Sequence, residues 1–292
     1  MNLDRTVSEP SKLLPHLFTA YPEVQKTKVR QWLKFSGVHV NGQPITRHDH
    51  ELEKGDRITI QPPKAPARVQ QTPLPSGLSI VHEDDDLIVL EKGAGWLTIA
   101  KDNGKGRNVY SVLTDYVRSV NPRLKVWIVH RLDRDTSGLI VFAKNEEAKH
   151  WLQDHWQDFE KRYLAVVEGS IATQSGTLRS FLDESNPLRV RSAPPSEETR
   201  EAITHYRVVR QSSGHSLIEL TLETGRRHQI RVQLSDARCP VVGDERYGAK
   251  KDPPASRLAL HAAHLHFQHP RDGREMTFES PLPAEMAKMM SH

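Results

Sequence analysis

The sequence predicts an α+β fold, in which a mixed, largely antiparallel sheet is flanked by helices and loops and is preceded by a small N-terminal domain. Short apolar segments typical of strands and longer segments typical of helices both occur after residue 78. They follow neither a strict strand and helix repeat nor an all-strand rhythm. Prolines punctuate residues 62–77, where few large apolar side chains are available to pack. We therefore expect two domains, residues 1–61 and 78–292, joined by a stiff linker.

The first 61 residues predict a pair of helices followed by a short sheet. Apolar residues cluster at positions 13–18, and a second helix is expected to be capped by Thr27 and to end at Gly37. The dipeptide Asn41-Gly42 predicts a tight hairpin turn, and residues 57–60 alternate as a strand does. This segment is too short to be the catalytic body.

The larger domain mixes both kinds of element without a fixed period. Strands are expected at residues 87–90, 139–143, 163–167 and 217–222, and helices at residues 109–120, 146–159 and 228–234. No internal repeat accompanies them. This order favours a largely antiparallel or mixed sheet over a regular parallel one.

The composition limits the kinds of protein that this chain can be. A hydrophobic fraction of 36% in 292 residues supports packed cores, and a net charge of +4 leans mildly toward an anionic partner. The single cysteine, Cys239, leaves no pair for an intrachain disulfide and excludes a cysteine-rich zinc site. No apolar leader and no segment of about 20 apolar residues is present. We expect a soluble protein of the cytoplasm or of an organelle matrix, with no membrane partner and no need for more than a monomer.

The first candidate for chemistry is the segment from His130 to Gly138, in which Asp133 stands between Arg131 and Arg134. An aspartate beside arginines is often only a paired surface charge. Here Thr136-Ser137-Gly138 predicts a tight turn before an apolar strand, which would place Asp133 at the rim of a buried sheet. That position favours a carboxylate held ready to react.

Two further segments offer partners for such a carboxylate. In residues 224–234, Gly225 suits a turn, and Arg227 and Arg231 lie four apart, so that on a helix they would share a face. They could clamp phosphate or neutralise a carboxylate, although a solvated basic helix is the alternative. Tyr163 follows Lys161 and begins an apolar strand, where it is either a core residue or a ring that stacks on a nucleobase.

In this order and at this separation, the three segments resemble the RluA-type pseudouridine synthases of ribosomal and transfer RNA, whose hallmark is H-R-L-D-x-x-T-S-G. Further matches extend the resemblance to about residues 78–283, at positions 242–244, 247–248, 260–262, 269–270 and 280–283. The first 61 residues resemble the alpha-L RNA-binding domain that a small-subunit ribosomal protein shares with several RNA-modifying enzymes.

The resemblance implies an enzyme that isomerises uridine in ribosomal RNA, or alternatively transfer RNA, without metal or redox cofactor. It implies that Asp133 is the essential carboxylate, either as nucleophile on the ribose or as the base that removes its proton. Arg231 would pair with Asp133, Tyr163 would stack on the target base and help to move a proton, and Arg131 would fill the place of the flipped base. The other expected RNA contacts are His130, Arg227, His228 and Lys161 in the large domain and Lys28, Arg30 and Lys34 in the small one.

Two other classes of protein compete with this interpretation. The chain could be an RNA chaperone or assembly factor whose second domain is idle, although intact Asp133, Tyr163 and Arg231 argue against that. It could also be a metal-dependent hydrolase built on the histidines of residues 261–269, but no paired carboxylate or cysteine in the sequence completes such a site.

One segment departs from the family pattern. The family usually has Asn-Lys-Pro followed by glycine near the start of the catalytic domain, where this chain has Glu91-Lys92-Gly93. We expect the loss of proline to loosen this loop and the added Glu91 to change its charge, with an effect on substrate preference rather than on the chemistry.

Overall fold

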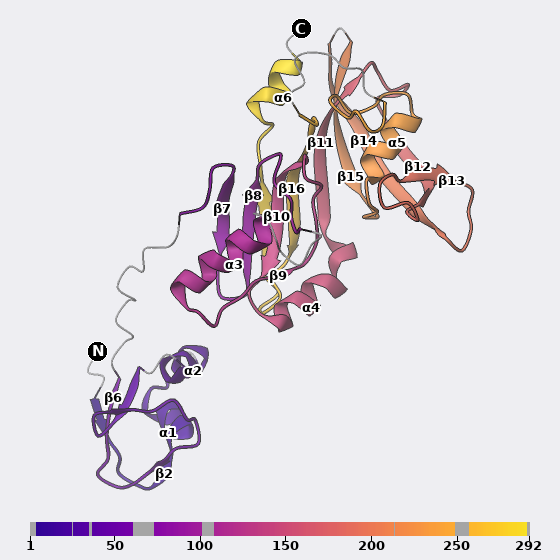
Figure 1. Ribbon diagram of the computed structural model, residues 1–292. Coiled ribbons are helices and arrows are strands. Elements are labelled where there is room, and N and C mark those ends of the chain that lie inside the picture. Colours follow the sequence, from indigo (N-terminus) through magenta and orange to yellow (C-terminus); the bar gives the residue numbers. More distant parts are fainter. Residues whose placement is uncertain are drawn as a thin grey trace. The chain divides into compact units, whose positions relative to one another are not determined.

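The computed structural model describes residues 4–24, 26–34, 37–60, 73–100, 108–212, 214–248 and 257–290. The chain divides into two compact units, Met1–Gln71 and Thr72–His292, and each is considered by itself (Figure 1). Most of the expected linker, residues 62–72, lies outside the described residues. Among the helices of the described ranges, none has the length and apolar character needed to cross a membrane.

The first unit is a pair of helices packed on short strands. The helices are α1 (Leu13–Ala20) and α2 (Lys26–Lys34); the strands are β1 (Asp4–Thr6), β2 (Ser11–Lys12), β3 (Val38–Val40), β4 (Gln43–Pro44), β5 (Glu51–Leu52) and β6 (Arg57–Ile60). Asn41 and Gly42 both have positive φ, of 51° and 84°, and join β3 to β4 in the two-residue turn that their sequence predicts. The expected cap is wrong, because α2 begins at Lys26 and Thr27 lies inside it.

The second unit is built on one sheet of eleven strands, in the order β13-β12-β14-β15-β11-β16-β10-β8-β7, with β17 beside β16 and β9 beside β10. Its strands are β7 (Leu78–Glu83), β8 (Leu87–Lys92), β9 (Trp127–Ile128), β10 (Ser137–Ala143), β11 (Glu160–Glu168), β12 (Ser175–Asp183), β13 (Arg191–Ala193), β14 (Thr199–Ser212), β15 (His215–Leu222), β16 (Leu260–Gln268) and β17 (Glu275–Glu279). The pair β10 and β16 is parallel, and the other named pairs of this sheet are antiparallel. The predicted α+β class with a mixed, largely antiparallel sheet is confirmed.

Helices flank this sheet (Figure 1). They are α3 (Val109–Val120), α4 (Glu146–Asp154), α5 (Gln229–Asp236) and α6 (Ala284–Met289), with a 3-10 turn at Trp156–Asp158. The bounds of α3 agree with the prediction, and Asn108 and Ser111 form a capping box at its start. The helix expected over residues 146–159 ends at Asp154 instead, because the chain turns at His155 into the 3-10 segment.

The central strands are buried on both faces, which explains their unbroken apolar runs. On β8, Ile88 and Leu90 pack in a cluster with Leu113 of α3, whereas Leu87 and Val89 pack in another with Leu152 of α4. The neighbouring strand β10 is buried along its whole length. The segment that ends at Ser137 therefore leads directly from the protein surface into the centre of the sheet.

Candidate active site

Asp133 lies in the tight connection that precedes β10. Its carbonyl oxygen accepts a hydrogen bond from the Thr136 backbone nitrogen at 3.2 Å, and Thr98 Oγ1 both donates to and accepts from the Leu132 backbone. The turn therefore spans Asp133 to Thr136 and begins three residues before the turn predicted at residues 136–138. The Asp133 side chain is 28% exposed, so it stands at the rim of the sheet, as expected.

Gly138 is required for a reason other than a turn. It already belongs to β10, with φ of +110°, and a Cβ atom there would lie 2.2 Å from the backbone oxygen of Ala262. The missing side chain lets β10 approach β16 at their short parallel contact. This close approach places the end of the Asp133 turn against β16.

Arg231, in the first turn of α5, links two carboxylates. Its Nη1 donates to Asp133 Oδ2 at 2.8 Å, while Nε and Nη2 donate to Asp244 Oδ2 at 2.6 Å and Oδ1 at 2.8 Å. Burial opposes the charge of Arg231, but the hydrogen bonds and charges of Asp244 and Asp133 raise its pKa overall. The two hydrogen bonds to buried Asp244 fix the guanidinium, which in turn holds one oxygen of Asp133.

Asp133, Arg231 and Tyr163 all line one cavity of about 80 Å³. The other lining residues are Arg131, Leu132, Thr136, Leu222, Arg226, His228, Gln229, Ile230 and Leu260. A larger hollow of about 1160 Å³ shares Arg231 with this cavity and contains neither Asp133 nor Tyr163. The smaller cavity is the one that brings the predicted carboxylate and the predicted ring together.

Tyr163 lies on β11 at an irregularity of the sheet. The register between β11 and β16 shifts between Arg162 and Tyr163, and such bulges redirect side chains next to functional sites. Burial, and then the charge of Asp133, raise the pKa of Tyr163. The phenol is therefore neutral at neutral pH and offers the cavity a ring face and a protonated hydroxyl.

Arg227 and Arg231 do not share a helix face as predicted, because neither Arg227 nor His228 belongs to the helix. Both precede α5, which begins at Gln229. The Arg227 guanidinium donates to backbone carbonyls of Glu184, Asn186 and Pro187, so it turns away from Arg231. His228 has the left-handed conformation, and its Nε2 lies 3.6 Å from Asp133 Oδ2.

The predicted RNA contacts in the large domain differ in whether their side chains already bond to other residues of the protein. Arg131 is exposed at the cavity, and within the described part of the chain its guanidinium makes no hydrogen bond or ion pair. His130 accepts from the Val141 backbone at 3.1 Å and stacks on Trp156. Lys161 is buried and donates to the Trp156 carbonyl at 2.8 Å. Both side chains are thus engaged within the protein.

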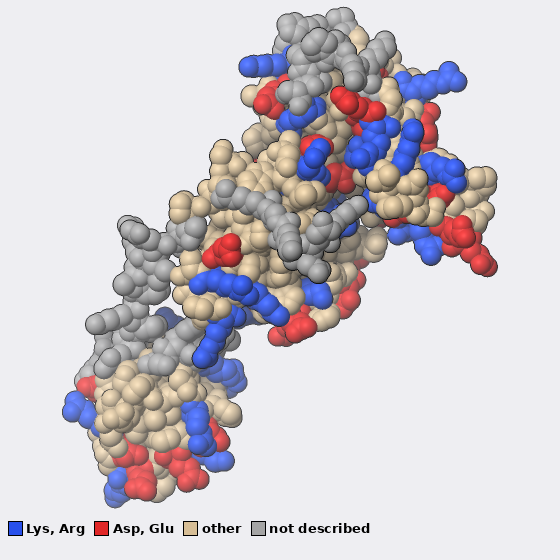
Figure 2. All heavy atoms as spheres, viewed as in Figure 1, with Lys and Arg blue, Asp and Glu red and all other residues tan. Residues whose placement is uncertain are grey.

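In the small unit, Lys28 and Arg30 are exposed on α2. The side chain of Lys34, at the end of the same helix, lies outside the described part. On the face of the molecule drawn in Figure 2, Lys and Arg side chains lie among Asp and Glu, in keeping with the small net charge. Charge alone therefore does not outline a path for RNA on this face.

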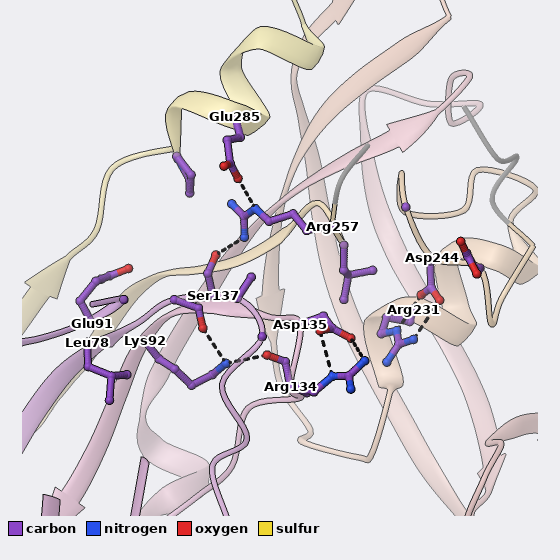
Figure 3. Close-up of a pocket in the computed structure, with 18 of the residues that line it drawn as sticks. Leu78, Glu91, Lys92, Arg134, Asp135, Ser137, Arg231, Asp244, Arg257 and Glu285 are labelled. Carbon is purple, nitrogen blue, oxygen red and sulfur yellow. Dashed lines mark hydrogen bonds and ion pairs between the residues drawn. The ribbon is translucent and has the colours of Figure 1, made fainter. Parts of the chain in front are cut away.

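The segment that departs from the family pattern is held in place rather than loosened. Lys92 is fully buried, and its ammonium donates to the carbonyls of Gly93 at 3.1 Å and Arg134 at 3.0 Å (Figure 3). It also donates to the Trp96 carbonyl at 2.9 Å. The Gly93 nitrogen donates to the Gly77 carbonyl at 2.7 Å, a hydrogen bond that proline would lack. The expectation of a loose loop is wrong, because the glycine nitrogen and the lysine supply the restraint.

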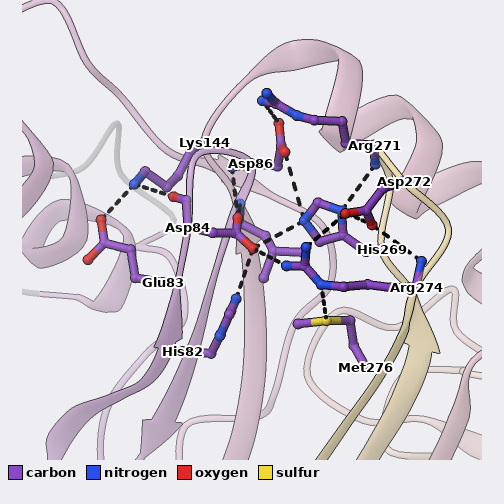
Figure 4. A network of polar contacts seen from close by, with 11 residues as sticks. His82, Glu83, Asp84, Asp86, Lys144, His269, Arg271, Asp272, Arg274 and Met276 are labelled. Carbon is purple, nitrogen blue, oxygen red and sulfur yellow. Dashed lines mark hydrogen bonds and ion pairs between the residues drawn. The ribbon is translucent and has the colours of Figure 1, made fainter. Parts of the chain in front are cut away.

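One cluster of the described residues has the spacing of metal ligands. Single ligand atoms of Asp84, Asp86 and His269 lie within 4.8 Å of one another. Arg274 donates to Asp84 at 3.1 Å, and Arg271 donates to Asp86 (Figure 4). Because arginines already neutralise both carboxylates, the cluster ties the turn after β7 to the turn after β16 and does not fit a cation.

Two residues near Asp133, namely Asp244 and Tyr247, were not among the site residues predicted from the sequence. Asp244 anchors Arg231, and the Tyr247 hydroxyl lies 2.8 Å from His228 Nδ1. Both belong to a stretch, residues 242–248, whose resemblance to the family was noted without a function. Only the folded chain brings this stretch beside Asp133.

Comparison with known proteins supplies the family context. The sequence profile described as RNA pseudouridylate synthase matches residues 86–236. The Bacillus subtilis protein named uncharacterized RNA pseudouridine synthase YlyB is 33% identical, over 99% of this chain and 97% of its own. The ribosomal large subunit pseudouridine synthase D of Salmonella typhimurium is 30% identical, over 99% of this chain and 94% of its own. The solved structure of human RNA pseudouridylate synthase domain containing 4 has a similar fold, with a TM-score of 0.62 at 22% identity over 73% of this chain and 93% of that one.

Proposed function

The chain belongs to the RNA pseudouridylate synthase family, and from that membership we propose that it converts specific uridines of ribosomal RNA to pseudouridine with Asp133 as the essential carboxylate. The observation that carries the proposal is the cavity in which Asp133, Arg231 and Tyr163 meet. Ribosomal RNA is favoured as substrate because the similar Salmonella protein is named for the large ribosomal subunit. Transfer RNA is the alternative substrate.

The reaction needs groups that hold and move protons, and no change of oxidation state. The bond from ribose C1′ to N1 of uracil breaks, the base turns, and C1′ bonds to C5, which loses its proton while N1 gains one. Atoms and electrons balance without a cofactor, so we propose that none takes part. The protein must stabilise the base and the ribose while they are separate.

Asp133 suits the task because one of its oxygens is held and the other is left to react. Oδ2 accepts from Arg231, whereas Oδ1 accepts no hydrogen bond from any described residue. We assign to Oδ1 either the attack on the ribose carbon or the removal of the ribose proton. Arg231 holds Oδ2 and so aims the carboxylate in both cases.

The target uridine has to leave its stack to reach this cavity. Flipping a nucleotide costs a few kcal/mol of unstacking. We propose that exposed Arg131, at the cavity, stabilises the vacated position, and that the ring of Tyr163 stacks on the uracil.

We further propose that residues 1–61 form an alpha-L RNA-binding domain. Helix α2 carries Lys26, Lys28, Arg30 and Lys34 and no carboxylate, which suits contact with phosphates. The tight Asn41-Gly42 turn and the strands around it support the comparison with that domain. This unit would add affinity for structured RNA.

The test is conversion of uridine by purified protein and by Asp133→Asn. The substrates are ribosomal and transfer RNA transcripts tritiated at uridine C5, since bond formation at C5 releases the label. We expect release from ribosomal RNA with the wild type, at least 1000-fold slower release with Asp133→Asn, and unchanged RNA binding by that variant.

The control is Asp115→Asn, on an exposed part of α3, which should react as the wild type does. A wild-type protein that binds RNA and releases no tritium from either substrate would indicate an assembly factor and refute the proposal. Normal turnover by Asp133→Asn would remove Asp133 from the mechanism.

A further inference from the structure

His228 occupies a conformation that only its surroundings can enforce. Its φ and ψ are 56° and 17°, a left-handed geometry that is uncommon for residues other than glycine and that often marks functional sites. The Gln229 side chain locks the turn on both sides: its Oε1 accepts from the Arg226 backbone nitrogen at 2.9 Å, and its Nε2 donates to the Ile203 carbonyl at 3.0 Å. The imidazole is thereby directed at Asp133 and Tyr247.

The contacts of the ring fix which nitrogen carries the proton. The Tyr247 oxygen accepts from the Val190 backbone nitrogen at 3.0 Å and lies 2.8 Å from His228 Nδ1. If Nδ1 carried the proton, the buried Tyr247 hydroxyl would have no acceptor among the described residues, which is costly. The hydroxyl therefore donates to Nδ1, and the proton of the neutral ring resides on Nε2.

That Nε2–H group faces the oxygen that Arg231 already holds. Nε2 lies 3.6 Å from Asp133 Oδ2, just beyond hydrogen-bond range, and the His228 side chain is only 10% exposed. Burial lowers the pKa of His228 to about 4 despite the opposing charge of Asp133, so the ring stays neutral at neutral pH. Hydrogen bonds of catalytic groups are often long in the absence of substrate and shorten when it binds.

We propose that His228 is a positioning residue for Asp133: its Nε2–H, directed by the Tyr247 hydroxyl, holds Oδ2 together with Arg231 while Oδ1 reacts. The inference rests on the proposed role of Asp133 and adds a polar chain from Val190 through Tyr247 and His228 to the carboxylate. A neutral donor orients the carboxylate without adding a charge that would quench its reactivity. Two donors on Oδ2 also stop the carboxylate from turning its free oxygen away from the ribose.

The test separates the two ring nitrogens. In His228→Asn the shorter amide occupies the place of Nδ1 and can still meet Tyr247, whereas in His228→Gln the amide nitrogen occupies the place of Nε2 and can still meet Asp133. Asparagine also tolerates the left-handed backbone well. Single-turnover release of tritium from saturating ribosomal RNA labelled at C5 of uridine is measured for both variants, with urea unfolding and RNA affinity as parallel readouts.

We expect His228→Asn to react about 10- to 100-fold more slowly than the wild type, and His228→Gln to stay within about threefold of it, with RNA affinity unchanged in both. Tyr247→Phe keeps the ring and removes the hydroxyl. Introduced into the wild type, it should slow the reaction by about 3- to 10-fold. Introduced into His228→Asn, it should cause no further loss of rate. The matched control is His150→Asn on the exposed face of α4, which should leave the rate unchanged.

The opposite order, with His228→Asn fast and His228→Gln slow, would show that only the Tyr247 contact matters and would overturn the proposal. Equal rates for both variants, whether normal or slow, would overturn it as well. Wild-type protein and Asp133→Asn are assayed alongside. If the wild type itself releases no tritium, the proposed function fails, and that result is distinct from any difference between the two His228 variants.

Discussion

Replacing Asp244 with asparagine probes the anchor of Arg231 without changing its size. The wild-type carboxylate accepts from Arg231 Nε at 2.6 Å and Nη2 at 2.8 Å while only 1% exposed. Asparagine keeps one oxygen and presents an amide donor to the other guanidinium nitrogen. One charge-assisted hydrogen bond is lost and the second becomes a bond to a neutral acceptor.

We expect Asp244→Asn to lower the free energy of unfolding by about 2–4 kcal/mol, because a hydrogen bond to a charged group contributes about 1.5–3 kcal/mol. Arg231 keeps Asp133 as an anionic partner, so the loss should fall short of the full cost of an unpaired buried charge. The freed guanidinium no longer aims Asp133, and the single-turnover rate should fall by about 10- to 100-fold.

Urea unfolding and tritium release measure the two effects on the same preparations. Asp115→Asn removes an exposed carboxylate on α3 and should change the stability by no more than about 0.5 kcal/mol. A variant at Asp244 that unfolds and reacts as the wild type does would refute the claim that Asp244 positions Arg231. Lost stability with a normal rate would confine Asp244 to the fold.

Two further predictions concern buried and exposed cations. The pKa of Lys92 is lowered by burial to about 8, from an ordinary value of 10.5, so the unfolded chain holds this proton more tightly than the folded one. The free energy of unfolding of the wild type, relative to that of Lys92→Met, should therefore rise between pH 8 and pH 10, by at most about 1.4 kcal/mol per pH unit. Urea unfolding of both proteins at each pH measures this difference. A difference that does not change with pH would contradict the prediction. Replacing Lys28 and Arg30 together with glutamine should weaken RNA binding and reduce its salt dependence, leaving the rate at saturating RNA unchanged. Lys54→Gln, on an exposed turn of the same unit, is the control, and an equal loss of affinity there would argue against a specific role for α2.

The local features of this fold could be predicted because they depend on neighbours in the chain. Asn41-Gly42 predicts its turn because both residues accept positive φ, and the apolar run of residues 139–143 predicts a buried strand. Boundaries were less certain: the helix begun at residue 146 stops at Asp154, where the chain turns into a 3-10 segment. The helix propensity of the residues does not show where a helix ends, because its end depends on how it packs against other elements.

Contacts between distant segments needed the tertiary structure. Gly93 shows this, since only the folded chain reveals that its nitrogen bonds to Gly77 and that Lys92 reaches Arg134. The sequence alone suggested a looser loop there. The need for glycine at position 138 likewise comes from the backbone of Ala262 on another strand.

The sequence by itself determined that Asp133 is the carboxylate to examine, because its motif stands between a polar turn and a buried strand. The tertiary structure decided what surrounds it. Of the two adjacent arginines, Arg134 pairs with Asp135 and exposed Arg131 lines the cavity, while Asp133 accepts from Arg231, 98 residues away. Neighbouring side chains in a turn point in different directions, so the partner of this carboxylate depends on how strands and helices pack and not on adjacency in the chain.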